Sequence, residues 1–347
     1  MDAPLIVPVF IPHLGCPHLC AFCNQTILTP QKIDESSLKS IPTKQIDEAI
    51  QTYLPFKGNR SRVELAFYGG NFLGLPKPEI TRLLGYLKPY LSQGIIHGIR
   101  CSTRPDTITR GRLDLVRSSG LSLVELGVQS MDDDVLNRVG RGHTSQDTRT
   151  AVRRLQEEGI QVGAQLMVGL PGDTRAGALG SAKQIAGLGV DLVRIYPVLV
   201  LGGSRLALWF AQGQYLPLSL DQAVGQVKEM FKVFEACDIP VTRMGLQASE
   251  MMEDRDQVVA GPWHPAFGHL VYSALMLDQV CEQVDAILPN QGSGAIEIAV
   301  NPRSESRLRG DKNSNMKALA LAYPGIEFSM EFSRNIHPKS VKVKALF

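Results

Sequence analysis

Hydrophobic residues recur along this chain in two alternating patterns. Short apolar runs, typical of buried strands, are followed by longer stretches in which apolar residues return every three or four positions, as on one face of a helix. The strand-like runs are residues 5–11, 63–68, 98–103, 121–129, 161–169 and 192–200. The helix-like stretches are residues 43–54, 78–91, 109–118, 145–158, 175–188 and 219–236. Strands that alternate with helices are typical of a parallel sheet with right-handed crossovers, so we predict an α/β fold.

The alternation ends near residue 239, and a smaller α+β extension is expected after it. Its candidate elements are a strand at 241–247, a helix at 265–284 and strands at 295–300 and 340–346. We therefore predict a first domain over residues 1–238 and a second domain over residues 239–347, with a boundary in the break of the pattern.

Residues suited to chemistry follow five of the six predicted strands. Cysteines follow the first strand, glycines the second, hydroxyl groups and a cation the third, an amide the fourth, and a Gly-Pro turn the fifth. In chain order they are Cys16, Cys20, Cys23, Gly69, Gly70, Ser102, Thr103, Arg104, Gln129 and residues 169–172. Because the carboxyl ends of parallel strands meet at one edge of a sheet, we predict a single site built from these residues.

The composition is that of an ordinary folded protein, with 347 residues of which 44% are hydrophobic and 20% charged. No apolar run is long enough to span a membrane, and the first residues lack the basic flank of a signal peptide. We therefore expect a cytoplasmic protein with no membrane partner. In that compartment the six cysteines indicate metal binding or catalysis rather than disulfides.

Charge is unevenly distributed along the chain. The formal net charge is +2, but residues 301–347 contain nine Lys/Arg and four Asp/Glu. Such a basic segment can contact the phosphates of RNA without reading sequence. A basic surface that only faces solvent is the alternative interpretation.

The three clustered cysteines point to a metal site with an open position. Cys16, Cys20 and Cys23 are spaced C-x-x-x-C-x-x-C directly after the first strand. A 4Fe–4S cluster takes one thiolate per iron, so three thiolates leave one iron open for another ligand. A structural zinc site with His13 or His18 as the fourth ligand is the alternative. We favour the iron–sulfur interpretation, because catalysis needs an open position.

The cysteine spacing, with the aromatic Phe22 before the third cysteine, resembles the signature of the radical S-adenosylmethionine (radical SAM) superfamily. The resemblance extends over residues 5–250 and includes the radical-SAM core of the Elongator catalytic subunit and its shorter bacterial relatives. Oxygen-independent coproporphyrinogen oxidases share part of it. The stretches that carry it are residues 67–72, 102–106, 125–130, 141–144 and 169–174. The resemblance implies a partial (β/α)6 TIM-type barrel of parallel strands.

The resemblance also implies roles for the residues at the strand ends. The three cysteines would bind a 4Fe–4S cluster whose open iron is chelated by S-adenosyl-L-methionine. Gly69 and Gly70 would bind the methionyl amino group, with Asn71 standing where Ser, Thr or Glu is usual. Gln129 would contact the ribose or the methionyl carboxylate. The other implied cofactor-binding residues are Phe22, Ser102, Thr103, Arg104, Gly169, Leu170 and Pro171, while Arg141 to Thr144 supply further donors.

The implied activity is reductive cleavage of S-adenosylmethionine to a 5′-deoxyadenosyl radical that abstracts a substrate hydrogen. An external one-electron donor such as a ferredoxin or flavodoxin is implied, and transfer RNA is the implied substrate class. Acetyl transfer is not expected, because residues 240–347 contain no recognisable Gly-rich acetyl-coenzyme-A loop. Two other functions stay open: a non-catalytic iron–sulfur redox or RNA-binding module, and a porphyrin-related radical SAM enzyme.

Overall fold

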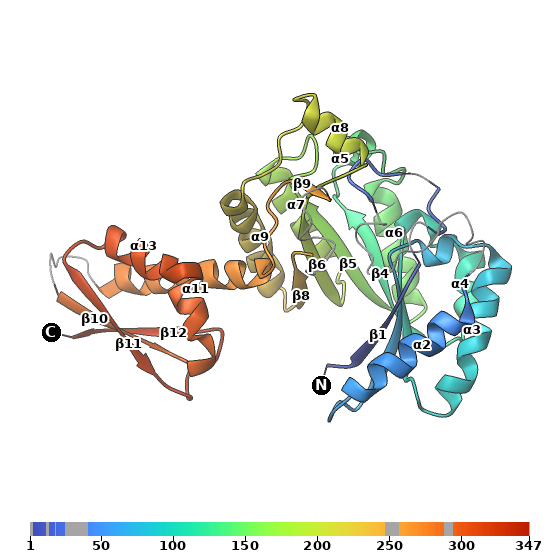
Figure 1. Cartoon of the computed structure of the whole chain (residues 1–347), viewed down its shortest axis with the longest axis horizontal. Helices are drawn as coiled ribbons and strands as arrows, with labels where there is room; N and C mark the ends of the chain where they lie inside the picture. The colour runs from blue at the N-terminus through green and yellow to red at the C-terminus, as the bar shows by residue number, and fades with distance from the viewer. Residues whose placement is uncertain are drawn as a thin grey trace.

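The core of the protein is a curled parallel sheet, seen in a computed structural model that describes residues 3–11, 14–17, 19–24, 41–246, 257–287 and 294–346. The sheet has seven strands in the order β1-β2-β3-β4-β5-β6-β8 (Figure 1). The strands are β1 (Leu5–Phe10), β2 (Val63–Tyr68), β3 (Gly98–Thr103), β4 (Leu121–Gln129), β5 (Gln161–Val168), β6 (Leu192–Pro197) and β8 (Val241–Met244). The predicted parallel half-barrel is therefore confirmed. Its seventh strand comes from the candidate strand that follows residue 239.

Helices cover the outer face of this sheet, because every second strand residue is apolar and points toward them. Leu65, Val124 and Ile195 from the strands share one hydrophobic core with Ile46 and Val227 from the helices. The covering helices are α2 (Thr43–Tyr53), α3 (Lys77–Ser92), α4 (Arg110–Val116), α6 (Ser145–Glu157), α7 (Arg175–Gly187) and α9 (Leu220–Glu235). The apolar residues that recur in the strands and those that recur in the helices thus pack against each other in one buried layer.

The inner face of the sheet carries charged residues that bond to one another. The Glu125 carboxylate accepts from Tyr68 Oη at 3.0 Å and pairs with Arg194 Nη2 at 2.9 Å. The neighbouring Arg100 pairs with Glu64 Oε2 at 2.6 Å and lies 3.7 Å from Glu125. Both carboxylates are buried, and each is compensated by a guanidinium. The network ties β2, β3, β4 and β6 together on the side of the sheet opposite the covering helices.

The C-terminal lobe forms a second, smaller layer. Its strands are β10 (Gly294–Val300), β11 (Ile326–Phe332) and β12 (Val341–Leu346), in the order β11-β10-β12 with β12 antiparallel to β10. The helices α11 (Phe267–Ile287), α12 (Glu305–Arg309) and α13 (Ser314–Ala322) contribute to the lobe. Val280, Ile298, Leu308 and Leu319 form its own hydrophobic core. Figure 1 shows this lobe projecting sideways from the barrel.

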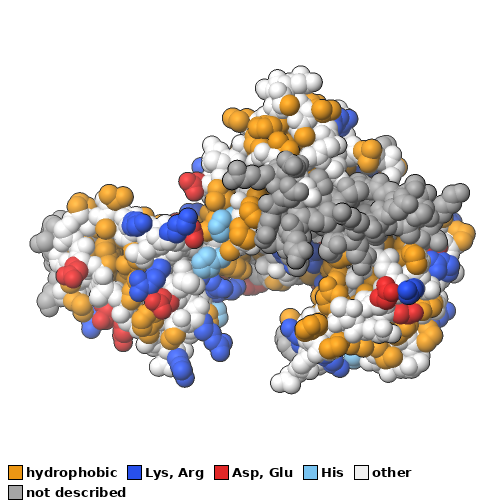
Figure 2. Space-filling view, viewed as in Figure 1, with side chains coloured by type: hydrophobic (Ala, Val, Ile, Leu, Met, Phe, Trp, Pro, Cys, Tyr) orange, Lys and Arg blue, Asp and Glu red, His pale blue; other side chains and the backbone are white. Residues whose placement is uncertain are grey.

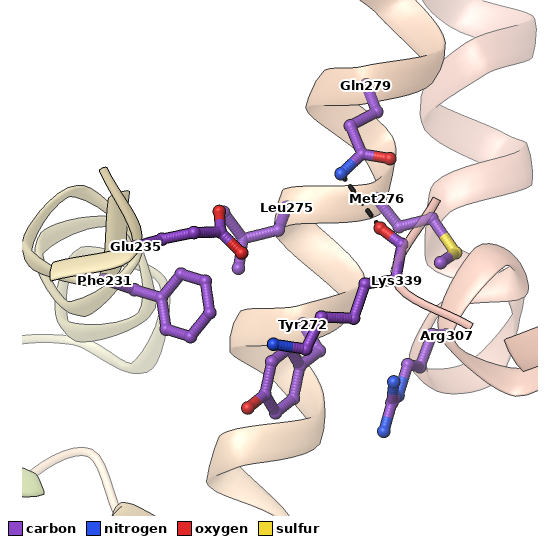
Figure 3. Close-up of a pocket in the computed structure, with 8 residues that line it drawn as sticks. All are labelled: Phe231, Glu235, Tyr272, Leu275, Met276, Gln279, Arg307 and Lys339. Carbon is purple, nitrogen blue, oxygen red and sulfur yellow. Dashed lines mark hydrogen bonds between the residues drawn. The ribbon is translucent and has the colours of Figure 1, made fainter. Parts of the chain in front are cut away.

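The lobe contacts the barrel where α9 meets α11. Asp278 on α11 pairs with Lys228 Nζ at 2.8 Å and with Lys232 Nζ at 2.7 Å, both on α9. A pocket lies in this junction, and Figure 3 shows its basic and aromatic lining. Its lining residues are Phe231, Glu235, Tyr272, Leu275, Met276, Gln279, Arg307 and Lys339. Within it, the Arg307 guanidinium lies 4.8 Å from the ring centre of Tyr272, a cation–π contact inside the chain.

Some elements differ from the sequence prediction. Strand β6 ends at Pro197 rather than near residue 200, and proline has no N–H with which to extend a ladder. Residues Val200–Leu201 instead form β7, which pairs antiparallel with β9 (Val258–Ala260). Strand β11 was not predicted, because much of it is exposed and its burial pattern is weak.

The boundary between domains at residue 238 stays a prediction. Within the described residues, none of the helices is both long and apolar enough to cross a membrane.

Replacing Glu125 by Leu tests the inner-face network. The substitution leaves the guanidiniums of Arg100 and Arg194 without one buried carboxylate, and breaking such a pair costs about 3–5 kcal/mol. We expect the free energy of unfolding, measured in urea, to fall by that amount. As a control, Arg153→Ala removes an exposed pair with Glu157 and should change stability by less than about 1 kcal/mol. Equal effects of the two substitutions would contradict the structural role of Glu125.

Candidate active site

The cysteine loop, described over residues 14–17 and 19–24, follows β1 at the carboxyl edge of the sheet and is held there by backbone hydrogen bonds. The Ala21 N–H donates to the Val139 carbonyl at 2.8 Å, and the Leu206 N–H donates to the Ala21 carbonyl at 2.8 Å. Inside the loop, the Cys23 N–H donates to the Cys20 carbonyl at 3.0 Å. The loop is thus fastened to the end of α5 (Asp133–Arg138) and to α8 (Arg205–Ala211).

Asn71 joins the cysteine loop to the ends of β2 and β3. Its Nδ2 donates to the Gly15 carbonyl at 2.7 Å. Its Oδ1 accepts from Thr103 Oγ1 at 2.6 Å and from the Arg104 N–H at 3.1 Å. Its backbone N–H donates to the Leu14 carbonyl at 2.9 Å. An amide carries a donor and an acceptor on one planar group, so this fully buried side chain serves both segments at once.

Glycines allow the cysteine loop to approach the turn after β2. A side chain at Gly70 would collide with the carbonyl oxygens of Ile11 and Leu14, and one at Gly15 would collide with the Asn71 carbonyl. Gly15 also has a φ of 75°, a conformation that favours glycine. The requirement for glycine at position 70 is therefore explained by contact between two backbone segments of the protein itself.

Two buried arginines lie beside the cysteine thiols. Arg141 Nη1 donates to Cys20 Sγ at 3.4 Å, and Arg104 is also buried at this edge. Arg104 Nε donates to Asp106 Oδ1 at 3.0 Å, and the two residues form an ion pair. Burial raises the pKa of the Cys16 thiol, and the positive charges of Arg141 and Arg104 act in the opposite direction.

Several buried polar atoms at this edge have no hydrogen-bond partner among the residues that the structure describes. They are Arg104 Nη1, Gln129 Oε1 and Arg141 Nε. The His143 ring is buried beside them, against the backbone of Val128. Burial, together with the charges of Arg141 and Arg104, lowers the pKa of His143 to about 2, so its ring is neutral near pH 7. Leaving such groups unpaired costs about 1–3 kcal/mol each. Cationic donors and an amide oxygen beside three thiols fit a ligand that carries both a carboxylate and an amino group.

The remaining predicted site residues lie around the same edge. Phe22 is half-buried and packs in a small cluster with Ala21 and Leu206, while Ser102 is half-buried at the end of β3. Gly169 has a φ of 81°, and its carbonyl accepts from Tyr215 Oη at 2.7 Å. The backbone of the predicted Gly-Pro turn is thereby fixed, with Leu170 and Pro171 buried beside it.

His13 and His18, the candidate zinc ligands, lie outside the described residues. In the described ranges no group of three or more His, Cys, Asp or Glu side chains is placed to hold a single metal ion. A cubane cluster has a different requirement, because each thiolate binds its own iron.

Sequence reasoning gave Arg141 and His143 only a general role as donors, and it did not single out Tyr215. The stretch from Arg141 to Thr144 carried a signal, because cations and a histidine there follow the fourth strand. Tyr215 carried none, since it lies 46 residues from its partner Gly169 and comes after the last strand end of the site.

A half-barrel of parallel strands with a three-cysteine loop and buried arginines at its carboxyl edge defines a class of cofactor-dependent α/β enzymes. The chain belongs to the Radical SAM superfamily, whose domain matches residues 10–185. A Radical_SAM C-terminal domain matches residues 190–276. Radical SAM enzymes use a 4Fe–4S cluster and S-adenosylmethionine, and the chemistry of the donors described above fits both groups.

Known relatives agree with the expected resemblance to Elongator-type proteins. A tRNA uridine(34) acetyltransferase of Dehalococcoides mccartyi is 27% identical over 255 residues, which cover 65% of this chain and 55% of that protein. The heme chaperone HemW of Bacillus subtilis is 24% identical over 189 residues, which cover 53% of this chain and 48% of HemW. This chain thus matches about half the length of these two relatives.

Among solved structures, the archaeal Elp3 of Methanocaldococcus infernus with an N-terminal deletion superposes with a TM-score of 0.60 at 21% identity. The superposition covers 79% of this chain and 63% of that one. At this level of identity the likeness concerns the fold, and it agrees with the curled parallel sheet described above.

Anaerobic reconstitution with iron and sulfide tests the cysteine loop. We expect an iron-dependent visible absorbance band in the wild-type protein, and its loss in Cys20→Ala, because one iron then lacks its thiolate. Cys237→Ala is the matched control, since Cys237 is exposed and lies outside the loop; its band should be unchanged. A wild-type protein that holds only zinc would contradict the cluster assignment.

Substitution of Asn71 tests the connection between the loop and the strand ends. Asn71→Ala leaves the Gly15 carbonyl and the Thr103 hydroxyl without their buried partner, which should lower the free energy of unfolding by about 1–3 kcal/mol. Because the loop is no longer fastened, the iron content per chain after reconstitution should also fall. Asn137→Ala, at an exposed asparagine of α5, serves as the control. Unchanged stability and iron content in Asn71→Ala would refute this role.

Proposed function

We propose that this protein binds a 4Fe–4S cluster through Cys16, Cys20 and Cys23, binds S-adenosylmethionine beside it, and acts on RNA. The observation that carries the proposal is the position of the cysteine loop next to buried, unpaired atoms of Arg104 and Arg141. When bound, the two groups supply a 5′-deoxyadenosyl radical that can abstract a hydrogen atom from a substrate carbon.

The residues of this chain have distinct parts in that proposal. The guanidiniums of Arg104 and Arg141 provide charge-assisted donors for a carboxylate. The unpaired Oε1 of Gln129 accepts from an amino or hydroxyl group, and the neutral His143, which donates to the Val128 backbone, adds an acceptor nitrogen. Backbone groups near the two glycine turns and the half-buried Phe22 hold the remaining parts of the cofactor. The proposed cofactor-binding residues are Phe22, Gly69, Gly70, Asn71, Ser102, Thr103, Arg104, Gln129, Gly169, Leu170 and Pro171.

Asn71 differs from the other residues in this set. Its side-chain atoms already bond to Gly15, Thr103 and Arg104. Within the proposal it therefore acts as a positioning residue, which keeps the cysteine loop and the end of β3 at a constant separation. Its backbone is also engaged, since its N–H donates to Leu14 and its carbonyl accepts from the Gly74 N–H at 2.9 Å.

The inner face of the sheet supports a polar substrate. Tyr68, Glu125 and Arg194 bond to one another on the inner face of the sheet and form a polar surface there. Arg194 Nε is buried and has no partner among the described residues, so it leaves one donor available. A polar surface of this kind suits a substrate with hydrogen-bonding groups better than a hydrocarbon.

RNA is the proposed substrate class because of the relatives and the basic C-terminal segment. One relative is named a tRNA uridine(34) acetyltransferase. In the C-terminal lobe, Lys342 and Lys344 on β12 and Lys317 on α13 are exposed. Figure 2 shows Lys, Arg and His side chains on the side of this lobe that borders a large hollow beneath the barrel. Cations in this arrangement can contact a phosphate backbone.

Production of 5′-deoxyadenosine tests the proposal. Reconstituted protein is incubated without oxygen with S-adenosylmethionine and dithionite, with or without total cellular RNA. We expect 5′-deoxyadenosine in the wild-type reaction, stimulation by RNA, and no product from Cys20→Ala. RNA treated with ribonuclease is the control for the stimulation.

Other outcomes would select another function. An intact cluster without any 5′-deoxyadenosine would favour a non-catalytic iron–sulfur module. Stimulation by a porphyrin but not by RNA would favour tetrapyrrole chemistry, for which the match to HemW provides the motive. Stimulation only by small metabolites would exclude RNA as the substrate class.

A further inference from the structure

The pocket where α9 meets α11, here called the junction pocket, holds two cations against aromatic rings. The Arg307 guanidinium lies 4.8 Å from the ring centre of Tyr272, and Lys339 Nζ lies 6.0 Å from the ring centre of Phe231. The two rings meet edge to face, with their centres 5.5 Å apart. Each ring of one aromatic pair therefore carries a cation, and Figure 3 shows these four side chains converging from three segments of the chain.

Neither cation is paired with a carboxylate in the part of the chain that the structure describes. Arg307 and Lys339 form no ion pair there, and their side chains donate no hydrogen bond. Cations close to them do have partners, since Arg309 pairs with Glu305 at 2.8 Å and two lysines of α9 pair with Asp278. An aromatic face attracts a cation but accepts none of its N–H groups in the ordinary way, so these donors stay available for a ligand.

The backbone that presents the two cations is fixed by hydrogen bonds. The Arg307 carbonyl accepts from Ser273 Oγ at 2.8 Å and from Asn315 Nδ2 at 3.2 Å. The Lys339 carbonyl accepts from Gln279 Nε2 at 3.1 Å, the bond drawn as a dashed line in Figure 3. Both cations are thus attached to α11 through their main chain. A ligand that binds them has less backbone to order, which favours binding.

The other described lining residues are mostly apolar, with one carboxylate. Leu275 and Met276 are buried at the base of the pocket. Glu235, the last residue of α9, is exposed and forms no ion pair with a described residue. The acidic residues at positions 250, 253, 254 and 256 lie outside the described part of the chain. Two unpaired cations against one carboxylate give the described lining an excess of positive charge, which suits an anion.

We propose that the junction pocket binds the phosphate group of a phosphate ester. The planar guanidinium of Arg307 can bind two phosphate oxygens at once, and the ammonium of Lys339 adds a second charge. The Tyr272 hydroxyl, which bonds to no other described residue, is a third donor at the same place. The buried Leu275 and Met276 offer apolar contact to the organic part that the phosphate carries.

The phosphate can come from the backbone of RNA or from a free nucleotide. The RNA source rests on the proposed function. It agrees with the position of both cations in the basic segment 301–347, which also supplies the exposed lysines of β12 and α13. A phosphate contact at the junction would bring bound RNA from the lobe to the edge of the barrel. A free nucleotide would instead make the junction pocket a separate small-molecule site.

Binding of two phosphate probes to the reconstituted holoprotein tests the proposal. A fluorescein-labelled single-stranded RNA is followed by anisotropy, and labelled AMP is followed by equilibrium dialysis, with adenosine as the probe that lacks the phosphate. Arg307→Gln should raise the Kd of the probe that uses the pocket by about tenfold, because one charge-assisted contact is lost. Arg307→Lys keeps the charge and should lose less affinity. Adenosine should bind far more weakly than AMP if the free nucleotide is the source.

Lys339→Ala provides a second variant at an exposed position. It should also weaken binding, and for RNA it should reduce the slope of log Kd against log salt by about 0.7, the value for one phosphate contact on a single strand. Lys88→Ala is the matched control, because Lys88 is an exposed lysine of α3 on the outer face of the barrel. Its Kd and salt slope should equal those of the wild type.

Glu235→Gln tests the sign of the ligand charge. Removal of an exposed carboxylate beside a bound anion relieves repulsion, so the Kd should fall by about twofold. A cationic ligand would respond in the opposite direction. This variant and Lys339→Ala keep the proposal testable if loss of the contact between Arg307 and Tyr272 destabilises the lobe.

The outcomes separate the pocket from the proposed function. Dependence of RNA binding on Arg307 and Lys339 identifies RNA as the source, and dependence of AMP binding identifies a free nucleotide. Unchanged Kd values for both probes in the two variants would overturn the proposal, as would weaker binding by Glu235→Gln. RNA that binds through the pocket but does not stimulate 5′-deoxyadenosine formation would count against the proposed function alone. Normal stimulation by RNA, with binding of both probes unaffected by the variants, would count against the pocket alone.

Discussion

The side chain of Asn71 holds together the parts of this site that come from separate segments of the chain. Its two polar ends bond to Gly15 in the cysteine loop and to Thr103 at the end of β3. The glycines at positions 15 and 70 let the backbones come close enough for these bonds. The described residues of the three-cysteine loop form no helix or strand of their own, so the position of the loop depends on such contacts with the strand ends.

The rest of the site follows from the curled parallel sheet. All its strands end at the same edge, which brings Arg104, Gln129 and the cysteine loop together although they are far apart in sequence. The helices bury the outer face, while the inner face keeps a compensated set of charges around Glu125 and Arg194. Among the described residues, several buried polar atoms without a partner lie at this edge, whereas most charges of the inner face bond to one another.

The C-terminal lobe is set apart from the half-barrel. The exposed lysines of β12 and α13 lie in this lobe, which has its own core. The lobe is attached through Asp278 to two lysines of α9.

Much of the fold could be predicted from the sequence. Where strands pack against helices, apolar residues must recur every second position in a strand and every three or four positions in a helix, and this spacing is visible locally. The spacing of Cys16, Cys20 and Cys23 likewise indicates a three-thiolate site without further information. Only the tertiary structure decides that the Asn71 side chain bonds to other parts of the protein, that Arg141 contacts Cys20, and that Tyr215 bonds to Gly169. These contacts join residues distant in sequence, so no local pattern records them; they arise when the sheet curls and its strand ends converge.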